Sequence, residues 1–227
     1  MAKVMGKVIL RGPRLSFDNI FEPAEEEKDD GTVVSVWKTN FLFPKDAAAR
    51  EKLGISAKHD GKTMDILAAL KLAGAEAMVR KYGDDVKKHP KIVGDRKYLR
   101  DGDTKEYEGY PDNYYFTAKA KLAERPSILT NRKDASDEWI EATPGGKNSP
   151  YAGAQVNAII SIWIMDHKKY GKRMCVSLHS VQFLKDGEPF RAKVANPNDD
   201  FTDEMIGEEG SIGDDFDGDD DDGDDLV

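Results

Sequence analysis

The sequence predicts a mainly β protein of the α+β class: a five-stranded, closed or partly open barrel with one helical insertion and a disordered acidic tail. Three observations lead to this prediction. Most apolar segments in residues 1–198 alternate with a period of two, which is typical of half-buried strands. The period changes to about 3.6 over roughly residues 45–83. The composition then changes abruptly at residue 199.

The N-terminal segment predicts two strands joined by a loop. Apolar residues on both sides of a Gly-Pro break indicate a bent strand over 8–17. An acidic loop follows at 21–31. The β-branched and aromatic run 32–43 predicts a long strand that ends at a proline. Its alternation places Trp37 with Phe41 on the buried face, and the alternative for Trp37 is a base-stacking platform.

The insertion predicts two helices and a basic connection. An alanine-rich segment at 46–53 indicates a short helix, and a longer helix is expected from near Thr63, whose hydroxyl would cap it, to about residue 82. Small and apolar residues form one stripe on the longer helix, which would let it pack closely on the sheet. Residues 84–109 are rich in lysine and arginine and predict a loop, hairpin or flexible edge.

The strand predicted over 113–121 has two faces of different character. Phe116 and the alanines that alternate with it can pack inward. Tyr115, Lys119 and Lys121 would point to solvent, and a face with one sign of charge plus an aromatic is what a nucleic-acid groove requires. This strand therefore favours nucleic-acid binding.

A second cationic and aromatic region lies on the predicted hairpin over 155–184, whose tip spans 167–173. We expect phosphate contacts from cations on these strands and on the basic loop: Lys119, Lys121, Arg125, Lys168, Lys169, Lys172 and Arg173, with Arg96 and Lys97 as further candidates. We expect base stacking from four aromatic residues: Tyr115, Trp163, Tyr170 and Tyr98. Trp163 is alternatively a core residue and Tyr170 a hairpin cap.

The two predicted regions of the chain carry opposite net charge. Residues 199–227 hold 15 of the 43 carboxylates and no lysine or arginine, which leaves 28 acidic against 34 basic residues in 1–198. A block of like charge cannot bury enough apolar surface to fold, so we expect a disordered tail. The tail also contains apolar residues that partner proteins could recognise: Phe216, Leu226 and Val227. The tail is either a solubilising segment or a nucleic-acid mimic that competes for the cationic groove.

The order of these segments resembles phage-encoded single-stranded DNA-binding proteins of the OB-fold class with an acidic C-terminal tail. The resemblance covers nearly the whole chain and rests on order and composition. It implies an OB-fold domain over 1–198, with the insertion at about 45–83, that binds single-stranded DNA without sequence preference in replication, recombination or repair. It also implies replication or recombination proteins as partners of the tail and the cytoplasm of an infected bacterium as the location. Many such tails end in an aromatic residue, whereas this one ends in Leu226-Val227.

Enzyme classes find little support in the sequence. The four histidines are far apart, the single cysteine cannot form an intramolecular disulfide, and no glycine-rich phosphate loop is present. We therefore expect no catalytic residue, no cofactor and no metal site. The alternatives are a metal-dependent nuclease that uses Asp95, Asp101 and Asp103, or an acidic structural or chaperone-like protein. The apolar N-terminal run is too short for a signal peptide, and we expect a soluble, untargeted protein without membrane contact.

Overall fold

The computed structural model describes residues 6–17, 19–28, 31–168 and 171–190, which belong to the first of two compact units, Met1–Ala192. Its strands are β1 (Lys7–Ser16), β2 (Ala24–Glu27), β3 (Val33–Pro44), β4 (Ser56–His59), β5 (Lys62–Asp65), β6 (Arg100–Asp101), β7 (Asn113–Lys121), β8 (Ser127–Lys133), β9 (Trp139–Glu141), β10 (Gln155–His167) and β11 (Gly171–Lys185). Its helices are α1 (Ala47–Lys52) and α2 (Ile66–Tyr82), with 3-10 turns η1 (Val86–Lys88), η2 (Gly94–Arg96) and η3 (Gly102–Thr104).

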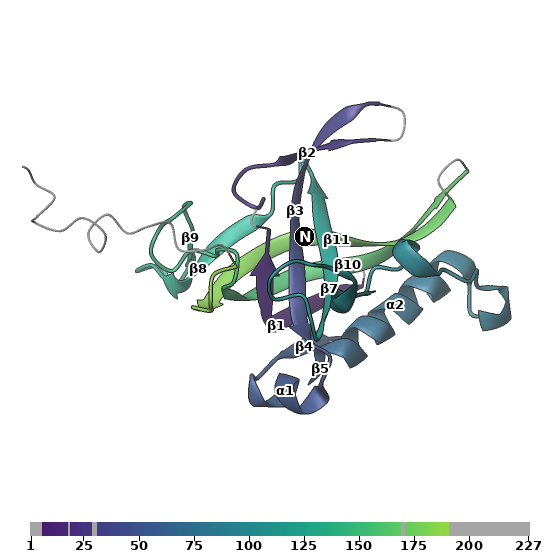
Figure 1. Cartoon of the computed structure of the whole chain (residues 1–227), viewed down its shortest axis with the longest axis horizontal. Coiled ribbons are helices and arrows are strands. Elements are labelled where there is room, and N and C mark those ends of the chain that lie inside the picture. The colour runs from purple at the N-terminus through teal and green to yellow at the C-terminus, as the bar shows by residue number, and fades with distance from the viewer. Residues whose placement is uncertain (1–5, 18, 29–30, 169–170, 191–227) are drawn as a thin grey trace, which may run out of the picture. The chain divides into compact units, whose positions relative to one another are not determined.

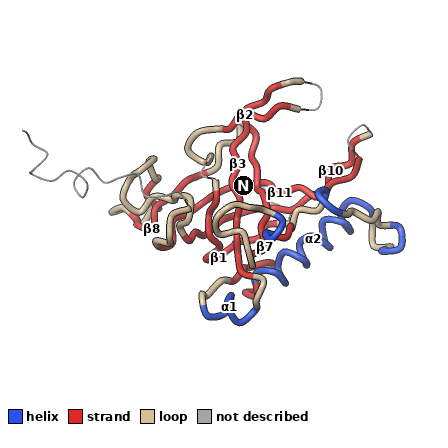
Figure 2. The backbone as a smooth tube through the Cα atoms, viewed as in Figure 1, coloured by secondary structure: helices blue, strands red, loops and turns tan. Residues whose placement is uncertain are grey.

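Five strands close into a ring in the order β1-β3-β7-β11-β10, and β10 pairs with β1 again. All the pairings in this ring are antiparallel except that of β11 with β7, which is parallel. This order is the topology of a five-stranded Greek-key barrel. The predicted mainly β, five-stranded barrel with a helical insertion is confirmed (Figure 1, Figure 2).

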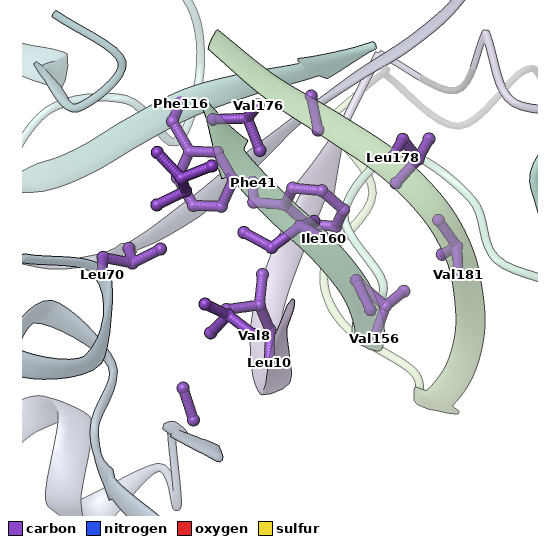
Figure 3. Close-up of a cluster of buried hydrophobic side chains, with 14 of the residues drawn as sticks. Val8, Leu10, Phe41, Leu70, Phe116, Val156, Ile160, Val176, Leu178 and Val181 are labelled. Carbon is purple, nitrogen blue, oxygen red and sulfur yellow. The ribbon is translucent and has the colours of Figure 1, made fainter. Parts of the chain in front are cut away.

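The core of the barrel is built from the inward faces of the ring strands. Phe41 of β3 and Phe116 of β7 lie together with their ring centroids 5.4 Å apart, and both are fully buried. Val8 of β1 and Ile160 of β10 approach from the other side of the ring, as Figure 3 shows. The predicted buried face of β3 is confirmed, because Trp37 is buried and its indole N–H donates to the Leu122 carbonyl.

The helical insertion connects β3 to β7 and packs on the barrel through the expected stripe of small residues. The buried positions of α2 include Leu70, Ala73, Gly74 and Ala77, and Leu70 points into the core in Figure 3. The predicted helix start at Thr63 is wrong. Thr63 lies in β5, and the Asp65 carboxylate caps α2 by accepting from the backbone N–H groups of its first turn.

Several short strands extend the ring beyond what the sequence predicted. The β4–β5 hairpin pairs with β1 between the two helices, where no strand was expected. β2 occupies part of the predicted acidic loop and pairs with β3. β8 joins β11 in parallel and pairs with β9. The long β10–β11 hairpin is confirmed. Among the described residues, no helix combines the length and apolar character needed to cross a membrane.

Candidate nucleic-acid interface

A groove crosses the outer face of the barrel and is lined by β2, β3, β7, β10, β11 and the segment between α2 and β7. The predicted residues Tyr115, Lys119, Lys121, Trp163, Arg173, Arg96, Lys97 and Tyr98 all line it. The fold therefore brings the two cationic and aromatic regions of the sequence onto one surface. Arg96 also lies beside Gly171, where a Cβ would be 3.0 Å from its guanidinium, so the basic connection reaches the β10–β11 hairpin.

Cations outnumber carboxylates in the lining of this groove. The lining cations are Lys28, Lys38, Arg96, Lys97, Arg100, Lys105, Lys119, Lys121 and Arg173, against the carboxylates Glu26, Glu27, Asp95 and Glu124. Within the described part of the chain, Arg96, Lys97, Lys105 and Arg173 form no ion pair with a carboxylate. The groove is thus electropositive, and several of its charges are available to an anionic ligand.

Two of the groove lysines face each other across the sheet. Lys38 of β3 and Lys119 of β7 are register partners, an arrangement that destabilises a sheet unless an anion lies between the ammonium groups. Glu26 of β2 supplies that anion, at 3.0 Å from Lys38 Nζ and 2.6 Å from Lys119 Nζ. Burial alone would raise the pKa of Glu26, but the hydrogen bonds and charges of the two lysines outweigh it and hold the pKa below its ordinary value.

The aromatic side of the groove includes Trp163 of β10. Its side chain is 44% exposed, and its indole N–H donates to the Ser177 hydroxyl at 3.0 Å. The alternative that Trp163 packs in the core is wrong, because its strand turns this residue outward between the buried Ile162 and Ile164. An exposed, oriented indole beside cations can stack on a flat apolar ligand.

Besides Trp163, the groove contains a pair of aromatic residues that the sequence analysis did not predict. Phe17 is 40% exposed and Tyr107 is 54% exposed, and their rings meet edge to face at 5.5 Å. Phe17 also has a φ of 60°, in the left-handed region that bulky residues rarely adopt. Residues held in sparsely populated backbone conformations cluster at active sites and ligand-binding sites. The signal that could have found this pair is the aromatic cluster 107–110 at the end of the basic loop.

Two predicted stacking residues lie deeper than expected. Tyr115 was expected to face solvent but is buried against Tyr110, with ring centroids 5.1 Å apart, because the segment before β7 folds over this end of the strand. The Tyr98 hydroxyl donates to the Leu70 carbonyl at 2.8 Å, which ties the basic connection to α2. Burial raises the pKa of the Tyr98 phenol. A role of either ring in DNA binding stays a prediction.

Other predicted phosphate-binding residues lie outside the groove lining. Arg125 lies over the Trp37 ring and pairs with Glu141 at 3.4 Å. Lys172 lies over the Tyr82 ring, 5.1 Å from its centroid, and Lys168 is exposed near the hairpin tip. Lys169 and Tyr170, and the predicted partner-binding residues Phe216, Leu226 and Val227, lie outside the described residues.

The aspartates of the nuclease alternative are engaged by a lysine instead of forming a ligand set. Lys45 Nζ lies 2.5 Å from Asp101 and 2.6 Å from Asp103, and these hydrogen bonds lower the pKa of both carboxyl groups. Asp95 does not join them in any group of three metal-ligating side chains among the described residues. This geometry gives the nuclease hypothesis no preformed metal site at these positions.

The closed ring, its strand order and the groove across it define an OB-fold barrel. Comparison with known proteins places the chain more narrowly. The profile of a family described as "Enterobacter phage Enc34, ssDNA-binding protein" matches residues 6–221, and the chain belongs to that family. The chain is also 30% identical over 210 residues to "Putative protein p50" of Acyrthosiphon pisum secondary endosymbiont phage 1, covering 91% of this chain and 98% of that protein.

Solved structures support the same fold. The single-stranded DNA-binding protein from bacteriophage Enc34 in complex with ssDNA superposes with a TM-score of 0.57 at 20% identity, over 82% of this chain and 90% of that chain. A second structure, of the single-stranded DNA-binding protein from bacteriophage Enc34, gives a TM-score of 0.57 at 19% identity, over 88% of this chain and 96% of that chain. The predicted resemblance to phage single-stranded DNA-binding proteins is confirmed.

Proposed function

We propose that this protein binds single-stranded DNA without sequence preference, in the groove between β3, β7, β10 and β11. The observation that carries the proposal is that the same groove holds exposed aromatic rings and cations that form no ion pair with any carboxylate the structure describes. Either feature alone is common on protein surfaces. Together they provide the two interactions that single strands need, because cations attract phosphates and aromatic rings stack on bases.

In this binding mode the cations and the aromatic rings would contact different parts of the DNA strand. Arg173, Lys97 and Lys105 would contact the phosphates, while Trp163 and the Phe17–Tyr107 pair would stack on bases at about 1–3 kcal/mol for each stacked base. Stacking is tolerant of sequence because every base has a π face. A duplex keeps its bases paired and stacked internally, so it cannot use these rings.

Tryptophan fluorescence tests this proposal directly, because the tryptophans have distinct environments. Trp37 is buried in the barrel, Trp139 lies on β9 away from the groove, and Trp163 lines the groove. Oligo-dT should quench the parent protein far more than duplex DNA does, and the quenching should be weaker at high salt. A Trp163→Phe variant should lose most of the quenching while Trp139→Phe keeps it. Equal affinity for duplex and single strands would contradict the proposal.

The same titration separates the alternative functions. A metal-dependent nuclease would shorten the oligonucleotide after Mg²⁺ is added, which gel electrophoresis detects. An acidic structural or chaperone-like protein would show no quenching. The family assignment and the groove favour DNA binding over both.

We further propose that residues 199–227 compete with DNA for the cationic groove and recruit replication or recombination proteins in the cytoplasm of the infected host. The support is the charge of the sequence, −15 in this segment against +6 in residues 1–198. A tethered anionic segment has an effective concentration of order millimolar, so weak association is enough to lower the apparent DNA affinity. DNA would displace it and expose Phe216 and Leu226-Val227 to partners.

Truncation after Asn198 tests the tail. The truncated protein should bind single strands more tightly than the full chain, with the largest difference at low salt, where screening is least. It should also lose any partner captured by the full chain, and the variant Phe216→Ala should lose that partner while its DNA affinity stays unchanged. If truncation does not tighten binding at low salt, the tail is not an internal competitor.

A further inference from the structure

A histidine and two carboxylates meet where the β4–β5 turn lies beside the second half of α2, outside the groove lining. His59 ends β4, Asp60 follows it in the β4–β5 turn, and Glu76 lies on α2. One ligand atom from each side chain lies within 4.8 Å of the other two. His59 Nε2 is 2.9 Å from Glu76 Oε2 and 3.9 Å from Asp60 Oδ2. None of the three lines the groove.

The hydrogen bonds of His59 define which ring nitrogen faces the carboxylates. The imidazole is 1% exposed, and its Nδ1 lies 3.0 Å from the Lys7 backbone carbonyl. A carbonyl oxygen accepts only, so Nδ1 must carry a proton and donate it. His59 Nε2 faces two carboxylates and is hydrogen-bonded to Glu76 Oε2 at 2.9 Å. Metal-ligating histidines have the same arrangement, with the second ring nitrogen donating to a backbone carbonyl.

Two carboxylates and one guanidinium surround Nε2. Two carboxylates bring −2, and among the described residues the nearby Arg80 brings +1, with its Nη1 at 3.7 Å from Glu76 Oε2. The second nitrogen of Arg80 is occupied, because Nη2 donates to the Ile162 carbonyl at 3.0 Å. One ring nitrogen and two carboxylates thus offer ligand atoms within 4.8 Å of one another, and a bound cation would take the place of the hydrogen bond between Nε2 and Glu76 Oε2.

The turn holds the third ligand in place. Asp60 and Gly61 have φ values of 46° and 79°, and they join His59 to Lys62 as a two-residue hairpin loop. Positive φ at both central residues is the signature of a type I′ turn, which aspartate and glycine favour. The backbone thus fixes the Asp60 carboxylate next to His59, while most of it stays open to solvent and accessible to an ion.

We propose that His59, Asp60 and Glu76 bind a divalent transition-metal ion such as zinc. One imidazole nitrogen and two carboxylate oxygens, with water completing the shell, are a suitable ligand set. Ligands about 2.1 Å from a tetrahedral ion lie about 3.4 Å apart, which falls within the range of separations found here. The ion would join the β4–β5 turn to α2 and, through Nδ1 and Lys7, to β1. This role is structural and does not depend on DNA binding.

The experiment uses the full chain freed of metal by a chelator and titrated with Zn²⁺ against a competing indicator. The parent should bind one ion at this site and gain thermal stability. Asp60→Asn keeps a residue that tolerates the turn, and Glu76→Gln keeps the side-chain length. Each should weaken zinc binding roughly tenfold or more and abolish the stability gain. Glu51→Gln, an exposed carboxylate of α1 outside the cluster, should behave as the parent.

Cobalt provides a second readout of the same ligands. Bound Co²⁺ should give visible absorption bands in the parent that disappear in Asp60→Asn and Glu76→Gln, whereas weak binding by the acidic tail would be the same in all variants. The proposal is overturned if the two variants bind zinc as tightly as the parent. It is also overturned if no ion binds to the parent protein. Oligo-dT binding should be unchanged throughout, which distinguishes this site from the groove.

Discussion

Charged side chains are numerous both in the groove and around α1 and the N-terminal end of α2. The two regions differ in whether these charges are buried and paired or exposed. At the helices, Arg50 is 5% exposed, its Nε and Nη2 donate to Asp65, and its Nη1 donates to the carbonyls of Pro44 and Lys45. In the groove, Arg173 and Lys97 are exposed and form no ion pair with any carboxylate that the structure describes. Charges of the first kind maintain the fold, and charges of the second kind remain for a ligand.

The difference has a physical origin in solvation. A buried guanidinium must replace all of its water with hydrogen bonds, so its neighbours are fixed by the fold. An exposed ammonium keeps its water and gives little stability through a surface pair. It can therefore exchange water for a phosphate at low cost. Substitutions in the two regions should consequently affect different properties, and the largest effect is expected at the buried guanidinium.

Replacing Arg50 by alanine should destabilise the protein by about 2–4 kcal/mol, because two backbone carbonyls and Asp65 lose their donors. Urea unfolding measures the loss. Lys52→Ala on the same helix is the matched control, and this exposed position should change stability by no more than about 0.5 kcal/mol. The folded fraction of Arg50→Ala should bind oligo-dT like the parent. Reduced DNA affinity with unchanged stability would contradict the assignment of Arg50 to the charges that maintain the fold.

Trp163→Ala should have the opposite effect, with reduced DNA affinity and nearly unchanged stability. Loss of one stacking ring should weaken single-stranded DNA binding by about 1–3 kcal/mol while the thermal melt stays near that of the parent. Trp139→Ala removes another exposed indole, on β9, and should leave the affinity unchanged. A loss of stability of about 3–5 kcal/mol in Trp163→Ala, the size expected for a core aromatic, would contradict this prediction.

Replacing Lys119 and Lys121 together by alanine should weaken binding, because each lysine that neutralises a phosphate releases counterions. The slope of log affinity against log salt should become shallower by about 0.7 for each lysine that binds a phosphate in the parent. A salt series of oligo-dT titrations measures the slope. The control pair is Lys58 and Lys62 on the β4–β5 hairpin, which are exposed and do not line the groove. An unchanged slope would show that the β7 lysines do not reach the phosphates.

The barrel could be predicted from the sequence because most of its strands alternate between apolar and polar residues. Phe116, Ala118 and Ala120 are buried as their period of two indicates. The β4–β5 hairpin shows where the prediction failed for a recognisable reason. Asp60-Gly61 is a strong hairpin signal, but its flanking strands span only Ser56–His59 and Lys62–Asp65 and have little alternation of their own. Pairing with β1 stabilises them instead.

The candidate site was predicted only in part, because it depends on residues distant in sequence. Lys119 and Trp163 were predicted as groove residues from local sequence, because each lies in a predicted strand near other cations or aromatic residues. The burial of Tyr115 could not be predicted, because it results from Tyr110 folding over β7. The cluster of His59 with Glu76 likewise forms only when α2 packs on the barrel. Strand patterns give the direction of a side chain, whereas only the assembled fold shows what covers it.

The smallest expected effect is an increase in affinity when the anion between Lys38 and Lys119 is removed. Glu26 occupies the place between two facing lysines, so a phosphate that bound both lysines would have to displace its carboxylate. Glu26→Gln should therefore tighten oligo-dT binding about two- to fivefold, equivalent to about 0.5–1 kcal/mol for a surface pair. Glu25→Gln on the same strand makes the same change in net charge outside the groove lining and should have little effect.

Acid should act in the same direction as Glu26→Gln. Because the folded-state pKa of Glu26 lies below its ordinary value, the carboxylate contributes stability at neutral pH that is lost as the pH falls through that folded pKa. In the same interval both lysines are released, so the affinity gained by Glu26→Gln over the parent should shrink toward zero as the pH is lowered. Parallel titrations of the two proteins from pH 7 downward measure this convergence. An advantage that persists in acid would mean that the substitution acts through the shape of the groove and not through its charge.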